Sequence, residues 1–230
     1  MELSKILNKS FLQDISSCMD ITKENFAGDY SEAVGNSQFK NGLSRAVWDV
    51  KYGQILDIAN QLELNPIIAD RKIWKAVVVL DQYTETLYAF TSDQNYRRVL
   101  NAITKGCKTH YFYLLSINSD EPIRKQTSLF KSTDDDAERF AHAQEILNDN
   151  IELAKHFVVI RYDYSNFVHG IISLLDNQGT ELSSMSMDEF LAKNQESIFP
   201  KIKEASLKGN TTQQLSKPLV SWKGKTKEIK

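Results

Sequence analysis

The sequence predicts an α+β fold in which a mainly antiparallel sheet is flanked by helices. Two blocks rich in β-branched residues, 67–91 and 156–187, indicate the strands. Apolar residues at three- and four-residue spacings near 43–64, 93–105 and 134–150 indicate the covering helices. Together these elements predict one core domain over residues 41–199, preceded by a helix and loop over 1–40 and followed by a loosely attached Lys-rich tail over 200–230.

The first forty residues carry one helical pattern followed by a polar stretch. Residues 3–20 have an amphipathic spacing, which predicts a helix that packs beside the core. Residues 24–40 are polar and include Gly28 and Gly35, so we expect a loop there. The apolar positions of the predicted helix are Leu3, Ile6, Leu7, Phe11, Ile15 and Met19.

The segment "NGLSRAVWDVKYGQILDIANQLEL", residues 41–64, is the best helix in the first half of the chain. Trp48 and Tyr52 lie one turn apart beside its apolar stripe, and Pro66 stops the helix. Gly53 inside the helix indicates a close approach by another element, or a bend. The stripe consists of Val47, Val50, Ile55, Ile58, Ala59 and Leu62.

A hairpin is predicted next. Residues 73–80, "IWKAVVVL", suit a strand covered on both faces. Asp81 begins the turn "DQYT", because an aspartate side chain accepts hydrogen bonds from the backbone of a tight turn. Residues 86–90 alternate as the return strand, and residues 67–69 fit a short strand before the hairpin.

Further elements complete the predicted core. Ser92 or Thr91 caps a helix whose buried face is Tyr96, Val99, Leu100 and Ile103 and whose C-terminal glycine is Gly106. Residues 110–115 fit either a strand or a short helix. The helix that begins after Ser132 or Thr133 is expected to bury one side, and a β-meander with a turn at Gly179 leads to a short helix after Ser186. The side expected to be buried comprises Ala137, Phe140, Ala141, Gln144 and Leu147.

Charge is distributed unevenly along the 230 residues. The whole chain has a net charge of −2. The last thirty residues hold eight lysines and two glutamates, a net charge of +6, so the preceding 200 residues carry −8. The overall balance argues against a chain that binds nucleic-acid phosphates along its whole surface, while a local basic patch stays open.

The compartment expected from the sequence is the cytoplasm. Two cysteines, Cys18 and Cys107, cannot form a disulfide framework. No apolar run approaches the roughly 18 residues needed to span a bilayer. The N-terminus lacks the continuous apolar core of a signal peptide. We therefore expect no membrane partner.

Motifs of known chemistry are missing from the sequence. Neither phosphate-binding glycine motif occurs, nor does H-E-x-x-H or G-x-S-x-G, so no cofactor, metal site or catalytic residue is predicted. His142 could share a helix face with Glu138 or Glu145, but two ligands do not make a zinc site.

One acid pair, Asp81 and Glu85, flanks the predicted turn. Carboxylates on adjacent strands can hold the metal ions of a nuclease, but a lysine is expected nearby and none follows Glu85. Asp49 and Lys51 have the acid-x-lysine spacing, yet they fall on a predicted helix. The structural alternative is that Asp81 forms the turn and Glu85 is an exposed hairpin residue.

Candidate binding residues lie on one helix and in the tail. Arg97 and Arg98 fall on the helix near 93–105, and Trp222 gives the tail an aromatic anchor beside Lys223 and Lys225. The tail could bind nucleic acid or an acidic protein, or it could be solvated and fold back on the acidic body. The aromatic clusters could stack bases or pack in the core. These clusters are Tyr111, Phe112 and Tyr113, and Tyr162, Tyr164 and Phe167.

Four segments, taken in order, carry a resemblance: "AVWDVKY", "KIWKAVVVLDQYTETLYAF", "HYFYLLSIN" and "HFVVIRYD". Over roughly residues 45–190, most clearly at Trp48, Asp49, Trp74 and the 81–88 hairpin, the chain resembles an uncharacterised domain family. That family is associated with low-GC Gram-positive bacteria, their plasmids and their phages. The resemblance implies a cytoplasmic bacterial or phage protein and transfers no catalytic residue.

Three functions follow as hypotheses. The first is a non-enzymatic protein-binding or regulatory protein, of the kind that phages and mobile elements use to inhibit host machinery. The second is a nucleic-acid-binding protein that uses the Lys-rich tail with Arg97 and Arg98. The third is a metal-dependent nuclease built on Asp81 and Glu85. The sequence leaves the oligomeric state open.

Overall fold

A six-stranded sheet runs through the centre of the computed structural model, which describes residues 3–35, 38, 40–70, 75–119, 133–163 and 168–195. The strands lie side by side in their order along the chain. Every neighbouring pair is antiparallel except β3 and β4, which are parallel, so the predicted mainly antiparallel sheet is confirmed. The strands are β1 (Asn65–Asp70), β2 (Lys75–Asp81), β3 (Thr86–Ser92), β4 (His156–Asp163), β5 (Val168–Leu175) and β6 (Glu181–Ser186).

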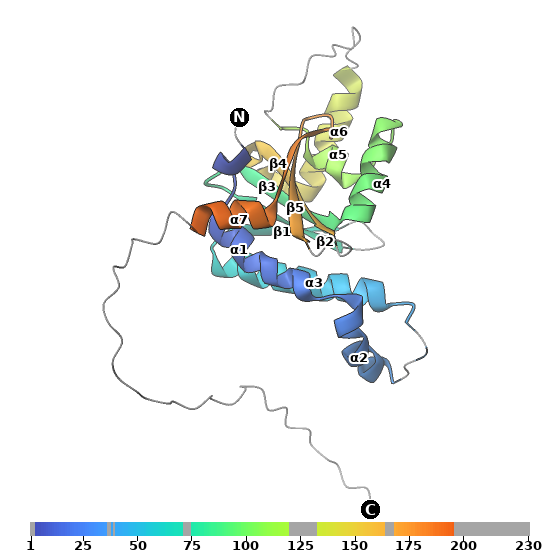
Figure 1. Cartoon of the computed structure of the whole chain (residues 1–230). Coiled ribbons are helices and arrows are strands. Elements are labelled where there is room, and N and C mark those ends of the chain that lie inside the picture. Colours follow the sequence, from blue (N-terminus) through green and yellow to red (C-terminus); the bar gives the residue numbers. More distant parts are fainter. Residues whose placement is uncertain are drawn as a thin grey trace, which may run out of the picture. The chain divides into compact units, whose positions relative to one another are not determined.

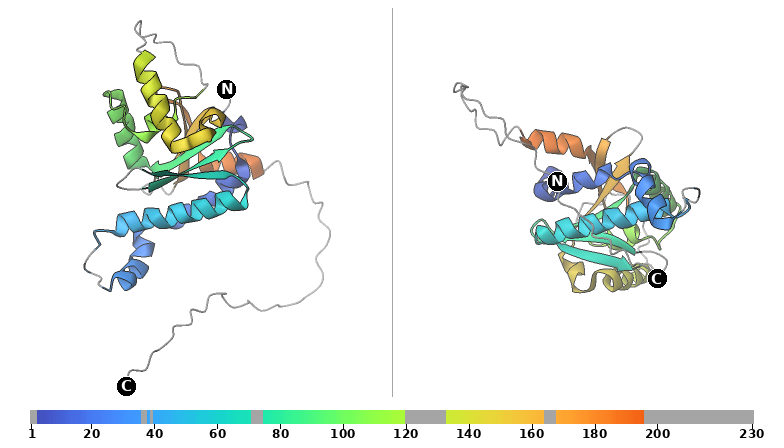
Figure 2. Two further views of the ribbon diagram at one scale, coloured as in Figure 1. Left: turned by 180° about the vertical axis from the view of Figure 1, so that it is seen from behind. Right: turned by 90° about the horizontal axis from the view of Figure 1, so that it is seen from below.

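Helices cover both faces of this sheet (Figure 1). One face packs against α1 (Lys9–Ser16), α3 (Leu43–Gln61) and α7 (Met187–Gln195). The other face packs against α4 (Asp93–Thr104), α5 (Tyr111–Leu115), α6 (Thr133–Leu147) and the 3-10 helix η3 (Asn148–Leu153). Both views of Figure 2 show α3 lying along the sheet. The chain divides into two units, Met1–Ile198 and Phe199–Lys230, and all described residues belong to the first.

Alternation along the central strands explains their continuous apolar sequence. Tyr88 and Phe90 of β3 belong to the core beneath α1 and α3, whereas Leu87 and Ala89 belong to the core beneath α4 and α6. Because successive side chains of a strand point to opposite faces, a strand covered on both sides needs apolar residues throughout. The predicted hairpin and its doubly covered strand are confirmed over the described residues, which begin at Lys75 for this strand; Trp74 lies outside them.

The parallel pair creates a particular edge of the sheet. A parallel connection needs a long crossover, and here α4, α5 and α6 form it. The carboxyl ends of β3 and β4 therefore lie side by side, with Ser92 paired to Tyr162. Since β2 runs antiparallel to β3, its first residue, Lys75, lies at the same edge. We call this side of the sheet, together with the start of α4, the open edge.

The predicted loop over 24–40 is wrong, because α2 (Lys23–Val34) occupies most of it. Thr22 Oγ1 accepts a hydrogen bond from the Asn25 N–H at 3.3 Å, and Asn25 Oδ1 accepts one from the Thr22 N–H at 2.7 Å. This capping box starts the helix, and Gly35 ends it with φ of +68°. No residue of α2 is buried, so the helix lacks the apolar stripe that would have marked it.

The N-terminal helix is present but shorter than predicted. Asn8 starts α1, because its side chain accepts a hydrogen bond from the Phe11 N–H at 3.1 Å. 3-10 turns flank it, namely η1 (Leu3–Lys5) and η2 (Ser17–Asp20). Five of the six apolar positions predicted for this segment are buried in the core as expected, namely Leu3, Ile6, Leu7, Phe11 and Ile15. The side chain of the sixth, Met19, lies outside the described part of the structure.

The face predicted for the helix near 134–150 is wrong in part. In α6 the side chains that face the core are Arg139, Ala143 and Leu147, of which only Leu147 was predicted. Phe140 is 36% exposed, and the other three predicted positions, Ala137, Ala141 and Gln144, are exposed as well. The buried side of α6 differs from the predicted one because Arg139 points inward. Its guanidinium donates hydrogen bonds to the backbone carbonyl oxygens of Tyr113 and Asn177, the latter at 2.6 Å. A charged residue in the centre of a buried stripe is a pattern that hydrophobic periodicity does not detect.

The remaining elements follow the predictions closely. Helix α3 covers most of 41–64, Ser92 caps α4, and residues 111–115 are a short helix. The turn at Gly179 has φ of +72°, which a glycine adopts without strain. Gly53 is exposed, and a methyl group there would meet no atom within 4 Å, so the close approach proposed for it is not found.

Candidate functional site

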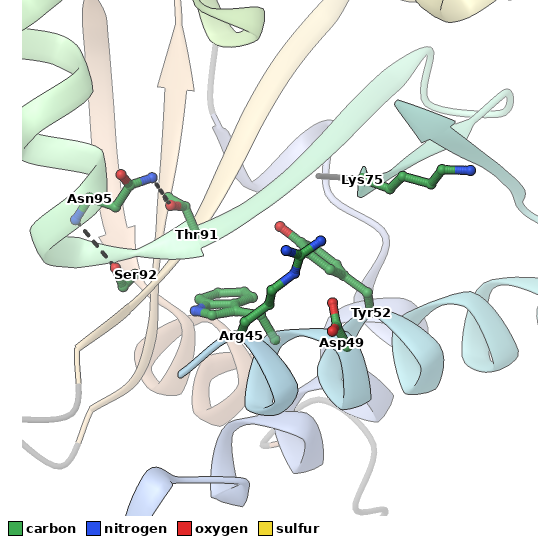
Figure 3. Close-up of a pocket in the computed structure, with 8 residues that line it drawn as sticks. Arg45, Asp49, Tyr52, Lys75, Thr91, Ser92 and Asn95 are labelled. Carbon is green, nitrogen blue, oxygen red and sulfur yellow. Dashed lines mark hydrogen bonds between the residues drawn. The ribbon is translucent and has the colours of Figure 1, made fainter. Parts of the chain in front are cut away.

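A pocket with a volume of about 360 Å³ lies at the open edge, between α3 and the end of β3 (Figure 3). Sites in open sheets form where parallel strands end, because the chain leaves the sheet there and the loops diverge. Four elements contribute to the walls of this pocket. The lining residues are Arg45, Trp48, Asp49 and Tyr52 of α3, Lys75 of β2, Thr91 and Ser92 of β3, and Asn95 of α4.

The α3 wall follows from helical periodicity. Positions 45, 48, 49 and 52 are separated by three and four residues, so their side chains share one face of α3. The rings of Trp48 and Tyr52 have centroids 5.5 Å apart, and Trp48 also packs 5.7 Å from the ring of Tyr162 in β4. The Tyr52 hydroxyl donates to the backbone oxygen of Phe90 at 3.5 Å. The aromatic wall is therefore held in place from the sheet.

The opposite wall is polar and is organised around Asn95. Its backbone N–H donates to the Ser92 hydroxyl oxygen at 3.2 Å, and its side-chain amide donates to the Thr91 hydroxyl oxygen at 2.7 Å. The Arg98 guanidinium donates to the side-chain amide oxygen of Asn95, Oδ1, at 2.7 Å. These bonds, two of which are drawn in Figure 3, fix the amide, and each hydroxyl group keeps its own hydrogen to donate.

Two cations and one acid line the pocket. Arg45 and Asp49 are exposed on α3, and Lys75 lies at the rim. Lys75 forms an ion pair with Asp70 at 3.5 Å, but both side chains are more than half exposed. Such surface pairs contribute about 0–1 kcal/mol, so Lys75 can reorient toward a ligand at little cost.

Tyr52 serves the pocket as a neutral hydroxyl group. Burial, followed by the negative charge of Asp49, raises the pKa of Tyr52 above its usual range. Because the phenol keeps its proton at neutral pH, it is not poised to act as a general base.

Lys51 lies on the inner side of α3 and is fully buried. Its ammonium group is 4.6 Å from the centre of the Tyr162 ring and 5.5 Å from that of Trp48, which is the geometry of a cation–π contact. Asp49 and Lys51 therefore face opposite ways on the helix, one exposed and one buried. The acid-x-lysine spacing in the sequence brings no acid and lysine together here, because residues two apart on a helix do not face each other.

Arg97 belongs to an ion-pair network at the same edge. Its guanidinium contacts Asp93 at 2.7 Å, although the Arg97 side chain is 71% exposed. Asp93 also bonds Arg161 at 2.9 Å, and Arg161 reaches Glu181 at 3.3 Å. The network ties the start of α4 to β4 and β6. Arg98, its neighbour, instead contacts pocket residue Asn95. The two arginines singled out in the sequence thus lie at the open edge.

The acid pair of the hairpin does not converge on one site. Asp81 is fully buried: one carboxylate oxygen accepts from the Tyr83 N–H at 2.9 Å, and the other accepts from the Asn8 amide at 2.9 Å. Glu85 is exposed and has φ of +52°. The structure thus places Asp81 in the turn, as its structural alternative predicted. A nuclease built on this pair stays a prediction, and the geometry lends it no support.

Other candidate residues are core residues or lie outside the described part of the chain. Tyr111, Phe112 and Tyr113 are buried, as is Tyr162, and none of them offers an open ring for stacking. Tyr164 and Phe167 lie outside the described residues, as do Trp222, Lys223 and Lys225, so the predictions for the tail stay predictions.

The cysteines and histidines form no recognisable reactive centre in the described part. Burial raises the pKa of the Cys18 thiol to about 11, in spite of the opposing charge of Lys51, so the thiol is protonated at neutral pH and is a poor nucleophile. His142 lies 3.8 Å from Glu138 and 3.4 Å from Glu145, with all three side chains exposed. Among the described residues, no three potential ligands come together as a metal site.

Comparison with known proteins identifies a family. A family model described as "Family of unknown function (DUF5986)" matches residues 4–230. The chain belongs to this family. The match is longer than the resemblance over 45–190, because it runs from residue 4 to residue 230. The description of the family names no activity. No curated protein and no solved structure matches the chain. No helix within the described residues is long and apolar enough to cross a membrane.

Proposed function

We propose that this chain is a non-enzymatic protein-binding protein with a regulatory role, of the kind that phages and mobile elements use to inhibit host machinery. One observation carries the proposal: Arg45, Trp48 and Tyr52 share one face of α3 and line one pocket. Arginine, tryptophan and tyrosine are the residue types enriched at the hot spots of protein interfaces, where a few side chains supply most of the affinity.

The pocket is organised before a partner arrives. Trp48 packs between Tyr52 and Tyr162, and Asn95 is held by bonds to Thr91, Ser92 and Arg98. Side chains that are already ordered lose less conformational entropy on binding, so more of the interaction energy appears as affinity.

The lining offers recognition chemistry rather than catalytic chemistry. The described lining residues include one carboxylate, Asp49, and no histidine or cysteine. Tyr52 keeps its proton, and the Asn95 amide is already engaged. General acid–base catalysis most often uses histidine, and no histidine is among the described residues that line this pocket.

The proposal is tested by affinity capture from the native host with the full chain as bait. We expect one protein to co-purify in stoichiometric amount with the natural sequence and to be lost with Arg45→Glu. Arg45 is exposed on α3, so its replacement removes no core side chain. Lys105→Glu supplies the control, since it changes the charge equally at the far end of α4 and should retain the partner.

Failure of the natural sequence to capture any protein in stoichiometric amount would overturn the proposal. Capture that is equal for the natural sequence and for Arg45→Glu would place the binding surface outside this pocket. Thermal unfolding of all three proteins, followed by circular dichroism, shows whether a loss of capture reflects a loss of fold.

Nucleic-acid binding is the second candidate, favoured by the contact between Arg98 and pocket residue Asn95 and by the exposure of Arg97. Bases stack on aromatic rings beside cations, and Trp48 and Tyr52 offer such rings. A salt-dependent shift of DNA or RNA, reduced by Arg98→Ala and by truncation after Pro200, would support this function. No binding at low salt would exclude it.

A further inference from the structure

We infer that the pocket at the open edge recognises an acidic segment of the partner protein, with a carboxylate held at Arg45 and an apolar side chain against Trp48 and Tyr52. The inference rests on the proposed function and specifies the chemistry of the partner. Three features of the described residues support it: the local charge, the excess of hydrogen-bond donors and the arrangement of the two cations.

The local charge is opposite in sign to that of the body. The first 200 residues carry a net charge of −8, yet the described residues that line the pocket include two cations and one acid. An anionic segment is therefore attracted to this point and repelled by the rest of the body, which favours one site and one orientation of binding.

The lining presents more donors than acceptors. Arginine and lysine side chains only donate hydrogen bonds. The Thr91 and Ser92 hydroxyl oxygens already accept from Asn95, so their O–H groups are left to donate. The Asn95 carbonyl oxygen is occupied by Arg98. A donor-rich wall matches a ligand rich in acceptors, and an ionised carboxylate is an acceptor only.

The arrangement of the two cations divides their roles. In Figure 3 the Arg45 side chain rises from α3 into the space between α3 and β3, while Lys75 runs along the rim away from it. We assign direct carboxylate contact to Arg45, whose planar fork can bind both oxygens. Lys75 adds positive potential at the entrance, where it can also pair with a second acid of the segment.

A peptide fits these features better than a nucleic acid does. A phosphate backbone needs a row of cations that follows its repeating charge. Here Asp49 lies beside Arg45, and Asp70 pairs with Lys75, so acids interrupt the row of cations. A carboxylate beside an apolar side chain requires only one cation next to the aromatic wall.

The test uses random peptides of about twelve residues displayed on phage, selected on the full chain and then synthesised with a fluorescent label. We expect the enriched sequences to be acidic and to carry an aromatic or aliphatic residue near the acid. Arg45→Glu should weaken binding at least about tenfold, a change of about 1.4 kcal/mol. Lys105→Glu should leave the affinity unchanged.

A charge swap then tests the contact itself. Replacing the critical acid of the selected peptide by lysine should abolish binding to the natural sequence and restore measurable binding to Arg45→Glu. Enrichment of neutral or basic peptides, failure to enrich any peptide, or equal affinity for Arg45→Glu would each overturn the inference. So would tighter binding of a labelled single-stranded oligonucleotide than of the acidic peptide at physiological salt.

The two proposals can fail separately. Loss of the host partner in Arg45→Glu, combined with a preference for basic or neutral peptides, leaves the protein-binding function in place and removes the acidic segment. Retention of the host partner in Arg45→Glu removes the inference and leaves the protein-binding function, whereas failure of the natural sequence to capture any protein removes both.

Discussion

The two ends of the β2–β3 hairpin use polar side chains in opposite ways. At the turn, Asp81 and Thr86 are fully buried, and both bond atoms of the N-terminal segment. At the open edge, Lys75 is exposed and Ser92 borders a pocket. The same two strands therefore have one end closed by the chain itself and one end accessible to a ligand.

The N-terminal segment causes the difference. The hydroxyl of Tyr88 accepts from the Asn8 N–H at 2.8 Å and donates to the Ile6 backbone oxygen at 3.4 Å. Asn8 adds its bond to Asp81, so the segment covers the turn and satisfies its polar groups. A buried acid with all its partners supplied is a structural residue. At the open edge the polar side chains instead line a pocket, where they can contact a ligand.

Asp81→Ala should cause the largest loss of stability. The change leaves the Tyr83 N–H and the Asn8 amide without their charged acceptor in a buried site. We expect the free energy of unfolding to fall by about 2–4 kcal/mol, since hydrogen bonds to charged groups contribute about 1.5–3 kcal/mol each. Urea unfolding followed by circular dichroism measures the change.

A swap of partners provides the control. Asn8→Asp alone places two carboxylates together, and Asp81→Asn alone places two amides together, so each should destabilise the protein. The double variant restores a donor–acceptor pair and keeps a good helix cap at position 8. Additive losses in the double variant would show that the side chains do not interact.

The sequence predicted the parts of the fold that hydrophobic periodicity records. Helix α3 and strands β2 and β3 have long, regular apolar patterns, and the turn chemistry of Asp81 was visible without coordinates. Helix α2 was missed because its stability comes from the capping of Thr22 and Asn25 instead of a buried stripe. The face of α6 was misassigned because Arg139 is buried by backbone carbonyl groups far away in the sequence.

The pocket could be predicted only in half. Trp48 and Tyr52 were recognised as neighbours on one helix, and Arg45 follows from the same spacing. Lys75, Ser92 and Asn95 join them only because β2 and β3 pair in a particular register beside the parallel β4, and that long-range pairing leaves no local signal. Local patterns describe one wall of a site, and tertiary pairing supplies the other.

Tyr88→Phe should have the next largest effect, a loss of about 1–2 kcal/mol at neutral pH, because it leaves the Asn8 N–H without an acceptor. Burial raises the pKa of Tyr88. The unfolded tyrosine therefore ionises first, above about pH 10. The contribution of Tyr88 to the free energy of unfolding is therefore fully present below that pH and is lost as the pH rises through the pKa of the folded state.

Unfolding of the Tyr88→Phe variant at several alkaline pH values checks the sign. We expect its free energy of unfolding to fall less steeply above about pH 10 than that of the natural sequence. Parallel curves would show that this hydroxyl does not keep its proton in the folded state.

Glu85→Gly should have a smaller effect, and of the opposite sign. Glu85 adopts φ of +52°, a left-handed conformation that costs a non-glycine residue roughly 1–2 kcal/mol. Glycine relieves that cost but loses more entropy on folding, so we expect a gain of about 0.5 kcal/mol in the free energy of unfolding. A loss above about 1 kcal/mol would show that the Glu85 side chain makes a stabilising interaction.

Arg45→Glu should have the smallest effect on stability and the largest on recognition. Arg45 is exposed in the first turn of α3, and exposed substitutions usually change stability by less than about 0.5 kcal/mol. The same change reverses the charge of the residue that we expect to bind the acidic segment. Urea unfolding and binding of the selected peptide are measured on the same preparation. We expect the midpoint of unfolding to stay unchanged and the binding to be lost. If the midpoint falls together with the affinity, Arg45 stabilises the fold. The open edge would then resemble the closed turn, where polar side chains serve the structure of the chain itself.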